Sequence, residues 1–374
     1  MAKICLCMIV KNESAIIERC LDSAKPILDY VFISDTGSTD GTQELIKNWL
    51  AKNEIQGEVQ DETFQNFGYN RTWAVSQAKK TFPGADYLLL LDADEMLEID
   101  AAFNKEELVA DSYMTMQYNH SLKYWYHRLL KTDAQWECVG VTHEYWDSPA
   151  SRGAKQLSTL VVNDLGDGGS KKDKFIRDEK LLTRAIADPK TDLGLKSRYI
   201  FYLANTYHDT DQWKKAIDWY QKRIDLQGWA EEVYYSYYRI GLCCNKLAER
   251  SPKAEQAKYK ALAVAAFQDA WNYRPARAEP LYELSRMYRI EKKYHLASLF
   301  ASRGLEIPFP AQDILFIDYT VYDYLLDYEL SISGYYVDKE KAKLRQRKLE
   351  KRTDLPWSIM KDIQHNARFY GENE

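Results

Sequence analysis

The sequence lacks any apolar run long enough to cross a membrane. The longest run near its start, Ile4 to Val10, covers about a third of what a spanning helix needs, and no signal-peptide cleavage region follows it. The six cysteines lack the paired C-x-x-C spacing of a metal site, so we expect reduced structural thiols. Low-complexity segments are absent as well. These absences favour a cytoplasmic globular protein without a transmembrane segment and argue against a disulfide framework or a disordered chain.

The 374 residues are too many for one compact core, so we expect two domains, 1–165 and 166–374. Charge is unevenly distributed between them. Residues 1–150 hold 13 Lys and Arg against 24 Asp and Glu, a net charge of −11, whereas the remainder has +6. The simple interpretation is that the two parts have solvated surfaces of opposite sign. The more specific interpretation is that the basic second half binds an acidic acceptor.

Short apolar runs alternate with amphipathic segments in the first 100 residues. The apolar runs predict strands at residues 3–10, 30–34 and 86–91, and the periodic segments predict helices that begin near residues 14, 42 and 70. This alternation favours an α/β domain with a mostly parallel, Rossmann-like sheet. In such a sheet the ligand crevice lies beyond the carboxyl ends of the strands, where polar turns occur in this sequence.

After about residue 190 the sequence becomes rich in tyrosine and repeats a pattern of small and large residues. The spacing is typical of tetratricopeptide helix pairs at Ile200, Leu203, Ala204, Tyr207, Ala216 and Tyr220 and again at Leu281, Leu284, Ser285, Tyr288 and Ala297. A third copy, with Gly241 and Ala263, requires an interhelical loop about ten residues longer than the standard unit. We therefore expect an all-α tetratricopeptide-like domain, with unrelated amphipathic helices as the alternative. Further helix is expected over Ile314 to Leu330, and a solvated basic helix over Lys339 to Arg352.

Two carboxylates leave the third predicted strand two positions apart, in Asp92-Ala93-Asp94-Glu95. At the carboxyl end of a buried strand both would point into the crevice, where they suit a hard divalent cation that also takes oxygens from a diphosphate. Such a cation neutralises a departing nucleoside diphosphate. A solvated acidic turn is the alternative.

The turn Asp35-Thr-Gly-Ser-Thr-Asp40, after the second strand, would face the same crevice. Asp35 could accept a hydrogen bond from a base imide N–H or a ribose hydroxyl, and Gly37 allows the backbone to approach a ligand closely. Capping of the next helix is the structural role of such a turn. We assign Asp35 to the ligand and Asp40 to capping.

Four motifs in order resemble those of family 2 glycosyltransferases with the GT-A fold. They are Met8-Ile-Val-Lys-Asn-Glu13, Asp35-Thr-Gly-Ser-Thr-Asp-Gly-Thr42, Phe67-Gly68 with Arg71, and Asp92-Ala-Asp-Glu95. The resemblance covers roughly residues 1–150 and is closest to the bacterial lipopolysaccharide-core type. Members of that type often read Phe-Gly-x-x-Arg-Asn, whereas Thr72 stands here in place of the Asn.

The resemblance implies a set of donor-binding residues, with inversion at the anomeric carbon. The nucleotide and its diphosphate would be held by Val10, Asn12, Glu13, Asp35, Gly37, Arg71, Asp92 and Ala93, and the metal by Asp92 and Asp94. An arginine fork suits a phosphate better than a lone lysine, and positive charge stabilises the departing diphosphate. The alternative for Arg71 is a surface helix arginine with its stem packed down.

The segment from Trp136 to Glu144 resembles the His-Glu segment that many such enzymes carry after the metal motif. The resemblance implies that His143 completes the coordination of Mn²⁺ or Mg²⁺ and that Glu144 is the general base for the acceptor hydroxyl. Asp164 and Asp167 are rival bases. The glycine-rich stretch that contains them could equally be an interdomain loop.

The sequence thus predicts an inverting, metal-dependent glycosyltransferase that uses a nucleoside-diphosphate sugar, of which a UDP-sugar is the leading candidate. The tetratricopeptide-like half would hold an acceptor glycan or protein on its concave face, and a homo-oligomer stays open. In one alternative the reaction is the same, but the sugar acceptor is a modified base of a nucleic acid that the basic second half binds. The other is a non-catalytic repeat scaffold that senses sugar nucleotides.

Overall fold

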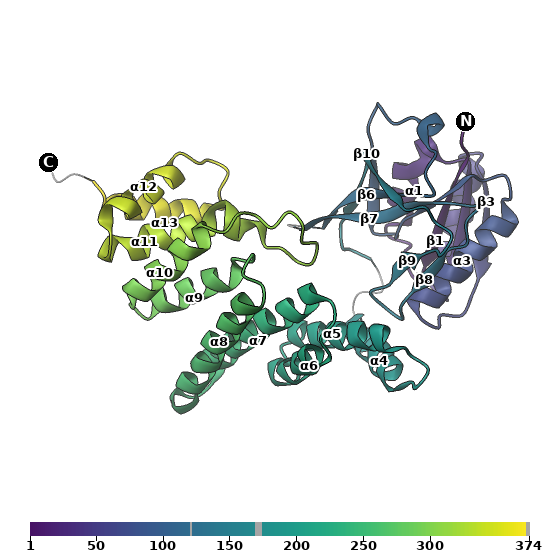
Figure 1. Cartoon of the computed structure of the whole chain (residues 1–374). Coiled ribbons are helices and arrows are strands. Elements are labelled where there is room, and N and C mark those ends of the chain that lie inside the picture. The colour runs from purple at the N-terminus through teal and green to yellow at the C-terminus, as the bar shows by residue number, and fades with distance from the viewer. Residues whose placement is uncertain (120–121, 169–173, 372–374) are drawn as a thin grey trace. The chain divides into compact units, whose positions relative to one another are not determined.

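The computed structural model describes residues 1–119, 122–168 and 174–371, and the chain divides into two compact units, Met1–Tyr199 and Ile200–Glu374 (Figure 1). The predicted fold class, an α/β domain followed by tetratricopeptide-like helices, is confirmed. The predicted domain division after residue 165 stays a prediction. A strand ends at Asp164, and the first compact unit continues beyond it into helical chain.

The first unit contains a large sheet and a separate hairpin. Its strands are β1 (Ile4–Val10), β2 (Tyr30–Asp35), β3 (Gln56–Asp61), β4 (Tyr87–Leu90), β5 (Glu95–Ile99), β6 (Ser112–Asn119), β7 (Leu122–Lys131), β8 (Glu137–Val139), β9 (Tyr145–Asp147) and β10 (Ala154–Asp164). The eight-stranded sheet has the order β3-β2-β1-β4-β7-β6-β10-β5, and β8 pairs with β9. The strands β3, β2, β1 and β4 are parallel to one another, so their carboxyl ends share one edge. The pairs β4·β7, β6·β7 and β5·β10 are antiparallel.

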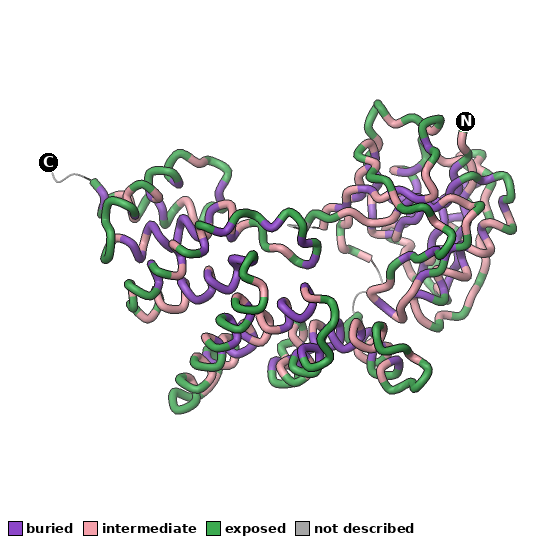
Figure 2. The backbone as a smooth tube through the Cα atoms, in the orientation of Figure 1, coloured by how far each residue is buried: buried purple, intermediate pink, exposed green. Residues whose placement is uncertain are grey.

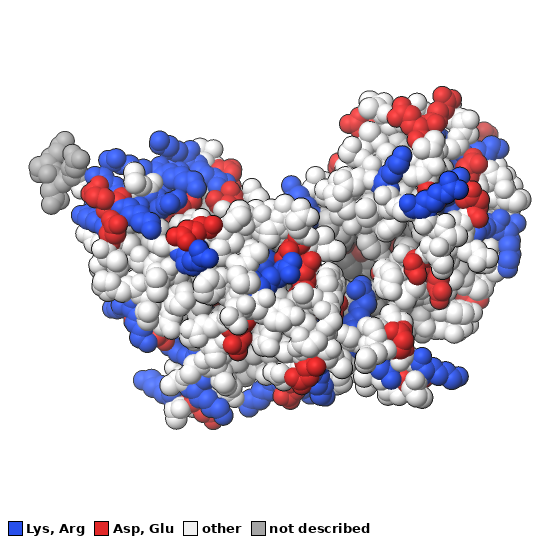
Figure 3. All heavy atoms as spheres, viewed as in Figure 1, with Lys and Arg blue, Asp and Glu red and all other residues white. Residues whose placement is uncertain are grey.

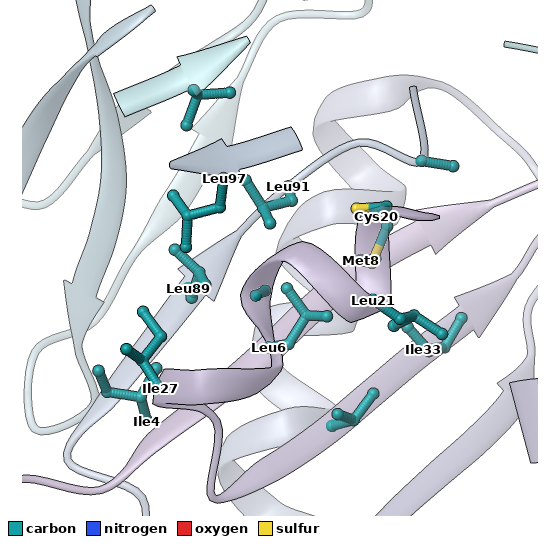
Figure 4. Close-up of a cluster of buried hydrophobic side chains, with 14 of the residues drawn as sticks. Ile4, Leu6, Met8, Cys20, Leu21, Ile27, Ile33, Leu89, Leu91 and Leu97 are labelled. Atoms are coloured by element: carbon teal, nitrogen blue, oxygen red, sulfur yellow. The ribbon is translucent and has the colours of Figure 1, made fainter. Parts of the chain in front are cut away.

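Helices cover both faces of this sheet, and strand periodicity explains how. They are α1 (Ile17–Ala24), α2 (Thr42–Lys52) and α3 (Phe67–Thr81). Two further helices, α4 (Lys174–Ala187) and α5 (Leu193–Asp209), follow the last strand along the chain. Ile4, Leu6 and Met8 of β1 share one core cluster with α1 and α2, whereas Cys5 and Cys7 share another with α3. Figure 4 shows the first cluster, with α1 over the sheet. Successive strand residues point to opposite faces, so a strand buried on both faces is apolar throughout, as predicted.

Local boundaries differ from the sequence expectations for identifiable reasons. The first helix begins at Ile17 rather than near residue 14. The N-cap of α2 is Gly41, and Asp40 contributes from one position earlier by accepting hydrogen bonds from the amide and hydroxyl of Thr42. Strand β3 was not predicted, because it lies at the sheet edge and its polar sequence has no apolar run.

The second unit is helical. Its helices are α6 (Trp213–Leu226), α7 (Ala230–Arg250), α8 (Lys253–Tyr273), α9 (Glu279–Ile290), α10 (Tyr294–Leu305), a π-helical turn (Val321–Leu325), α11 (Leu326–Ser333), α12 (Lys339–Glu350) and α13 (Trp357–Ala367). From α6 to α13 each helix packs against the next. Gly241 marks a close helix crossing, because a Cβ there would lie 2.5 Å from the Phe267 ring. Figure 2 shows buried positions along the helices of this unit, and exposed ones along α12 and α13.

Two helix expectations in this unit were wrong. The extra residues of the third repeat copy do not form a long loop; they lengthen α7 and α8 to 21 residues each, joined by Ser251 and Pro252. The helical segment expected from Ile314 begins only at Tyr319, because the preceding chain is anchored by a side chain instead. Glu231 accepts hydrogen bonds there from the amides of Ile314 and Leu315. In the described part of the chain, no helix combines the length and apolarity that crossing a membrane requires.

The six cysteines provide a test of the fold. All are buried free thiols, and burial raises the pKa of Cys7 and Cys243 to about 12 and that of Cys244 to about 11. Because the thiolate is the reactive form, we predict that Ellman's reagent labels none of them rapidly in the native protein at neutral pH. In guanidinium chloride without reductant all six should react. Rapid labelling of the native protein, or fewer than six thiols after unfolding, would contradict this assignment.

Candidate functional site

Two loops at the carboxyl ends of β1 and β2 are joined by hydrogen bonds. The Asn12 amide donates to Ser38 Oγ at 2.8 Å, and Asn12 Oδ1 accepts from the Thr39 amide at 2.8 Å. The Glu13 amide donates to the Thr42 hydroxyl at 2.8 Å. Asn12 adopts a positive φ of 56°, a conformation that asparagine tolerates better than most residues. Two of the predicted donor-binding residues therefore belong to one ordered double loop.

Asp35 is fully buried at the end of β2, where it pairs in register with Val10. Its Oδ1 accepts hydrogen bonds from the amides of Gly37 at 2.8 Å and Ser38 at 2.7 Å. Its Oδ2 is buried and has no hydrogen-bond partner among the described residues. A buried carboxylate oxygen without a donor is unfavourable, so it suits a ligand that brings an N–H or O–H.

Arg71 on α3 joins two of the predicted acidic residues. Its Nη2 lies 2.7 Å from Asp92 Oδ1, and its Nε lies 2.7 Å from Glu144 Oε1. Only 17% of the Arg71 side chain is exposed. Burial opposes the charge, but Asp92 and Glu144 outweigh it and hold the pKa of the Arg71 guanidinium well above its usual value. Three predicted residues from distant segments thus form one charged cluster, and the surface alternative for Arg71 is wrong.

Glu144 reaches this cluster because the loop between β8 and β9 is fixed to the start of α3. The amide of Phe67 donates to the Val141 carbonyl at 3.1 Å, and that of Gly68 donates to the Gly140 carbonyl at 3.0 Å. These contacts satisfy two of the amides that a helix N-terminus leaves without intrahelical partners. A Cβ on residue 68 would lie 2.3 Å from the Gly140 oxygen, so only glycine permits this approach.

Further contacts hold the same loop from other sides. Thr72 stands where the Phe-Gly-x-x-Arg-Asn motif has its asparagine, and its hydroxyl accepts a hydrogen bond from the Cys138 amide at 2.8 Å. The His143 carbonyl accepts from Nε and Nη2 of Arg198 at 3.2 and 2.9 Å, and His143 adopts a positive φ of 52°. The Tyr199 hydroxyl accepts from the Val141 amide. The backbone of the loop, and with it Glu144, is therefore constrained by α3 and by residues 198 and 199.

The predicted three-residue metal site stays a prediction. Among residues 1–119, 122–168 and 174–371, no three His, Cys, Asp or Glu side chains are grouped so that they could hold a metal ion. Ala93 is buried between the two aspartates in the chain. Gly168 lies beside Asp94, since a Cβ there would be 3.2 Å from Asp94 Oδ2. Two carboxylates alone still fit Mg²⁺ or Mn²⁺ when a substrate diphosphate and water supply the other oxygens.

The rival bases Asp164 and Asp167 lie in a segment next to Asp94, whose carbonyl accepts a hydrogen bond from the Leu165 amide at 3.0 Å, and both carboxylates have partners of their own. Asp167 forms a two-point ion pair with Arg19, with distances of 2.8 and 2.7 Å. Asp164 accepts hydrogen bonds from Asn119 at 2.6 Å and from the Gly166 amide at 3.0 Å. The glycine-rich stretch that contains both extends to Gly169, which lies outside the described residues.

A second charged cluster was missed by sequence reasoning. Arg128 of β7 is buried and donates hydrogen bonds to Glu95 and Gln117 and, at 3.1 Å, to the Leu90 carbonyl. Glu95 Oε2 accepts from the Asp92 amide at 2.8 Å. Burial raises the pKa of Glu95, although the Arg128 guanidinium opposes this shift. A lone arginine within the aromatic and apolar sequence of β7 was the available signal, since a buried charge requires a partner.

The fold and these contacts define a chain with two parts. A sheet presents acidic residues and an arginine at the carboxyl ends of its parallel strands, and tetratricopeptide-like helices follow. Residues 5–105 match the model of Glycosyl transferase family 2.

A TPR repeat-containing protein of Synechococcus elongatus is 35% identical over 101 residues, which are 27% of this chain and 23% of that protein. The chain therefore matches less than a quarter of that relative's length. S. aureus TarS 1–349 in complex with UDP-GlcNAc is 13% identical with a TM-score of 0.34, over 89% of this chain and 91% of that one. A thermophilic TPR protein of Thermus thermophilus is 12% identical with a TM-score of 0.35, over 52% of this chain and 91% of that one. At such TM-scores both structural likenesses are distant.

The contact at Gly68 yields a stability prediction. Gly68→Ala would bring a methyl group against the carbonyls of Gly140 and Cys138, which are backbone atoms and cannot turn away. We expect a loss of about 1–3 kcal/mol in urea unfolding, the usual cost of overpacking. Gly84→Ala is the matched control, because its Cβ would meet only the Tyr30 hydroxyl at 3.4 Å. Equal stability of the two variants would show that the approach of α3 to the hairpin is not close.

Proposed function

We propose that the chain is an inverting glycosyltransferase that transfers a sugar from a nucleoside-diphosphate donor, in the first instance a UDP-sugar, to an acceptor hydroxyl. The observation that carries the proposal is the contact of Arg71 with both Asp92 and Glu144 at the carboxyl end of β4. It combines an anion-binding guanidinium, an acidic residue of the metal motif and a candidate general base in one cluster. The match of residues 5–105 to Glycosyl transferase family 2 supports the same reaction.

The buried carboxylate of Asp35 supports the donor side of the proposal. Its orphan Oδ2 requires a hydrogen-bond donor, which the imide N–H of uracil or a ribose hydroxyl supplies. Val10, Asn12, Glu13 and Gly37 surround this position in the double loop. We therefore assign these residues to the nucleoside of the donor.

Arg71 would change partners during the reaction. In the structure the guanidinium is bonded to Asp92 and Glu144, and a diphosphate offers more negative charge to the same group. Movement of the guanidinium toward the diphosphate would release Glu144 to accept the proton of the acceptor hydroxyl. The acceptor oxygen then forms the bond to the anomeric carbon as the bond to the diphosphate breaks on the opposite face.

A divalent cation would be held by Asp94 and Asp92 together with diphosphate oxygens, not by His143. It would stabilise the charge that develops on the leaving diphosphate. Asp94 is the ligand that we expect to be essential, since Asp92 also bonds to Arg71. The acceptor class stays open among a glycan, a protein and a nucleic acid.

Donor turnover tests this assignment. We predict that the chain releases nucleoside diphosphate from one member of a panel of UDP-, GDP- and TDP-sugars, only with Mn²⁺ or Mg²⁺, and that Asp94→Ala abolishes the release. Asp133→Ala is the control, because it removes a carboxylate that is 66% exposed and pairs with Lys131. Circular dichroism of both variants verifies the fold.

Two results would contradict the proposal. Full activity of Asp94→Ala would exclude the cation site, and release that persists in EDTA would exclude metal dependence. If no donor is turned over but calorimetry detects nucleotide binding, an acceptor screen follows. Continued inactivity in that screen would favour a scaffold that senses sugar nucleotides.

The identity of the base is tested by neutral isosteres. We predict that Glu144→Gln lowers turnover by about 10²–10⁴-fold, the usual contribution of a general base, while donor affinity changes little. Asp164→Asn and Asp167→Asn should retain most of the activity, since these carboxylates are bonded to Asn119, Gly166 and Arg19. An active Glu144→Gln protein with an inactive Asp164→Asn or Asp167→Asn protein would move the base to the other loop.

A further inference from the structure

The outer side of α12 carries cations and an exposed leucine. Ala342, Gln346 and Leu349 face the core, and the opposite side of the helix includes Arg347 and Leu344, which is 67% exposed. Residues 339–352 contain eight Lys or Arg and two Glu. Figure 3 shows Lys and Arg side chains gathered at this end of the second unit.

Some of these cations attach the helix to its own unit. Arg345 and Lys348 bond to the buried Asp327, and Arg352 bonds to Asp323 and Asp354. Arg347 and Lys351 lie on the exposed side instead. The helix is thus attached to its own unit on one side, while its outer side remains positively charged. The sequence predicted only a solvated basic helix here.

The neighbouring helix α13 carries an exposed tryptophan of its own. Trp357, at its first turn, is 72% exposed, and the ammonium of Lys361 lies 5.3 Å from its ring centre. Phe369, just after α13, is 48% exposed. The two helices pack together through a shared cluster that includes Leu349 and Ile363, and the Gln346 side chain donates to the Ile363 carbonyl at 2.7 Å. Cations and large apolar side chains therefore project from one firmly packed helix pair.

We propose that the outer sides of α12 and α13, defined by Leu344, Arg347, Lys351, Trp357 and Lys361, form a docking surface for an anionic lipid bilayer. Lysine and arginine near an anionic leaflet each add to the attraction, and tryptophan with leucine gains from burial at the headgroup boundary. An anionic polymer such as a nucleic acid would satisfy the cations, but it offers no apolar phase for an aliphatic side chain such as Leu344. The combination of charge with exposed Leu344 and Trp357 therefore favours a membrane.

Vesicle sedimentation of the full chain tests this surface. We expect it to pellet with vesicles of equal parts phosphatidylcholine and phosphatidylglycerol but not with phosphatidylcholine alone. The triple variant Arg347→Gln, Lys351→Gln, Lys361→Gln should bind roughly a hundredfold more weakly, because it loses the usual contribution of three cationic side chains to the binding free energy. High salt, which shortens the screening length to about 3 Å, should have a similar effect on the wild type. Trp357→Ala should weaken binding while leaving its salt dependence unchanged.

Lys214→Gln, Lys253→Gln, Lys258→Gln is the matched control, because it removes the same charge from exposed positions on α6 and α8. Equal loss in the two triple variants would overturn the proposal, as would binding to neutral vesicles with the same affinity. Failure to bind anionic vesicles, together with salt-sensitive binding of single-stranded DNA or RNA that the first triple variant loses, would assign the surface to nucleic acid. Donor turnover should be the same in all these variants, so this test is independent of the proposed function.

Discussion

The positive charge of Arg71, buried between two acidic residues, is the interaction on which the arrangement of the candidate site depends. Removing a guanidinium from water costs several kcal/mol, and the chain offsets this with Asp92 and Glu144. These carboxylates come from the end of β4 and from the β8–β9 loop, so the helix, the sheet and the hairpin must fit together for either bond to form. Asp94 adds another carboxylate two positions after Asp92. Carboxylate oxygens are ligands that a divalent cation prefers, and a diphosphate would bind more readily with such a cation than without it.

Backbone and side-chain contacts together position the hairpin that supplies Glu144. The first amides of α3 bind carbonyls of residues 140 and 141, and the absence of a side chain at Gly68 permits this approach. Behind Asp92, Glu95 binds its amide and is itself held by Arg128. The acidic end of β4 is thus fixed by a second ion pair that is more deeply buried than the first. A rigid acidic edge with one exchangeable arginine is suited to a ligand that brings both charge and a metal ion.

The sequence predicted the strands β1, β2 and β4 and the repeat helices, because each left a local signal. Strands buried on both faces are continuous apolar runs, and Asp35, Arg71, Asp92 and Asp94 lie in motifs next to such strands or at a helix start. Other features had no local signal. The pairing of Arg128 with Glu95 joins residues 33 positions apart, and no periodicity indicates it. The role of His143 as a metal ligand stays a prediction, because a ligand set depends on which side chains a loop turns inward, and here Arg198 holds the loop by its backbone.

Net charge along the sequence gave the least reliable guide to function, because it does not distinguish buried from exposed groups. Much of the negative charge of the first unit acts inside it: Asp35 and Glu95 are buried, and Asp92 and Glu144 bond to Arg71. The positive excess of the second unit has the opposite character, since its densest segment, residues 339–352, has several cations on the outer side of a helix. Two regions with comparable charge bias therefore have different physical consequences. The first sets the local electrostatics of a binding crevice, whereas the second creates a field that only a large anionic surface can use fully.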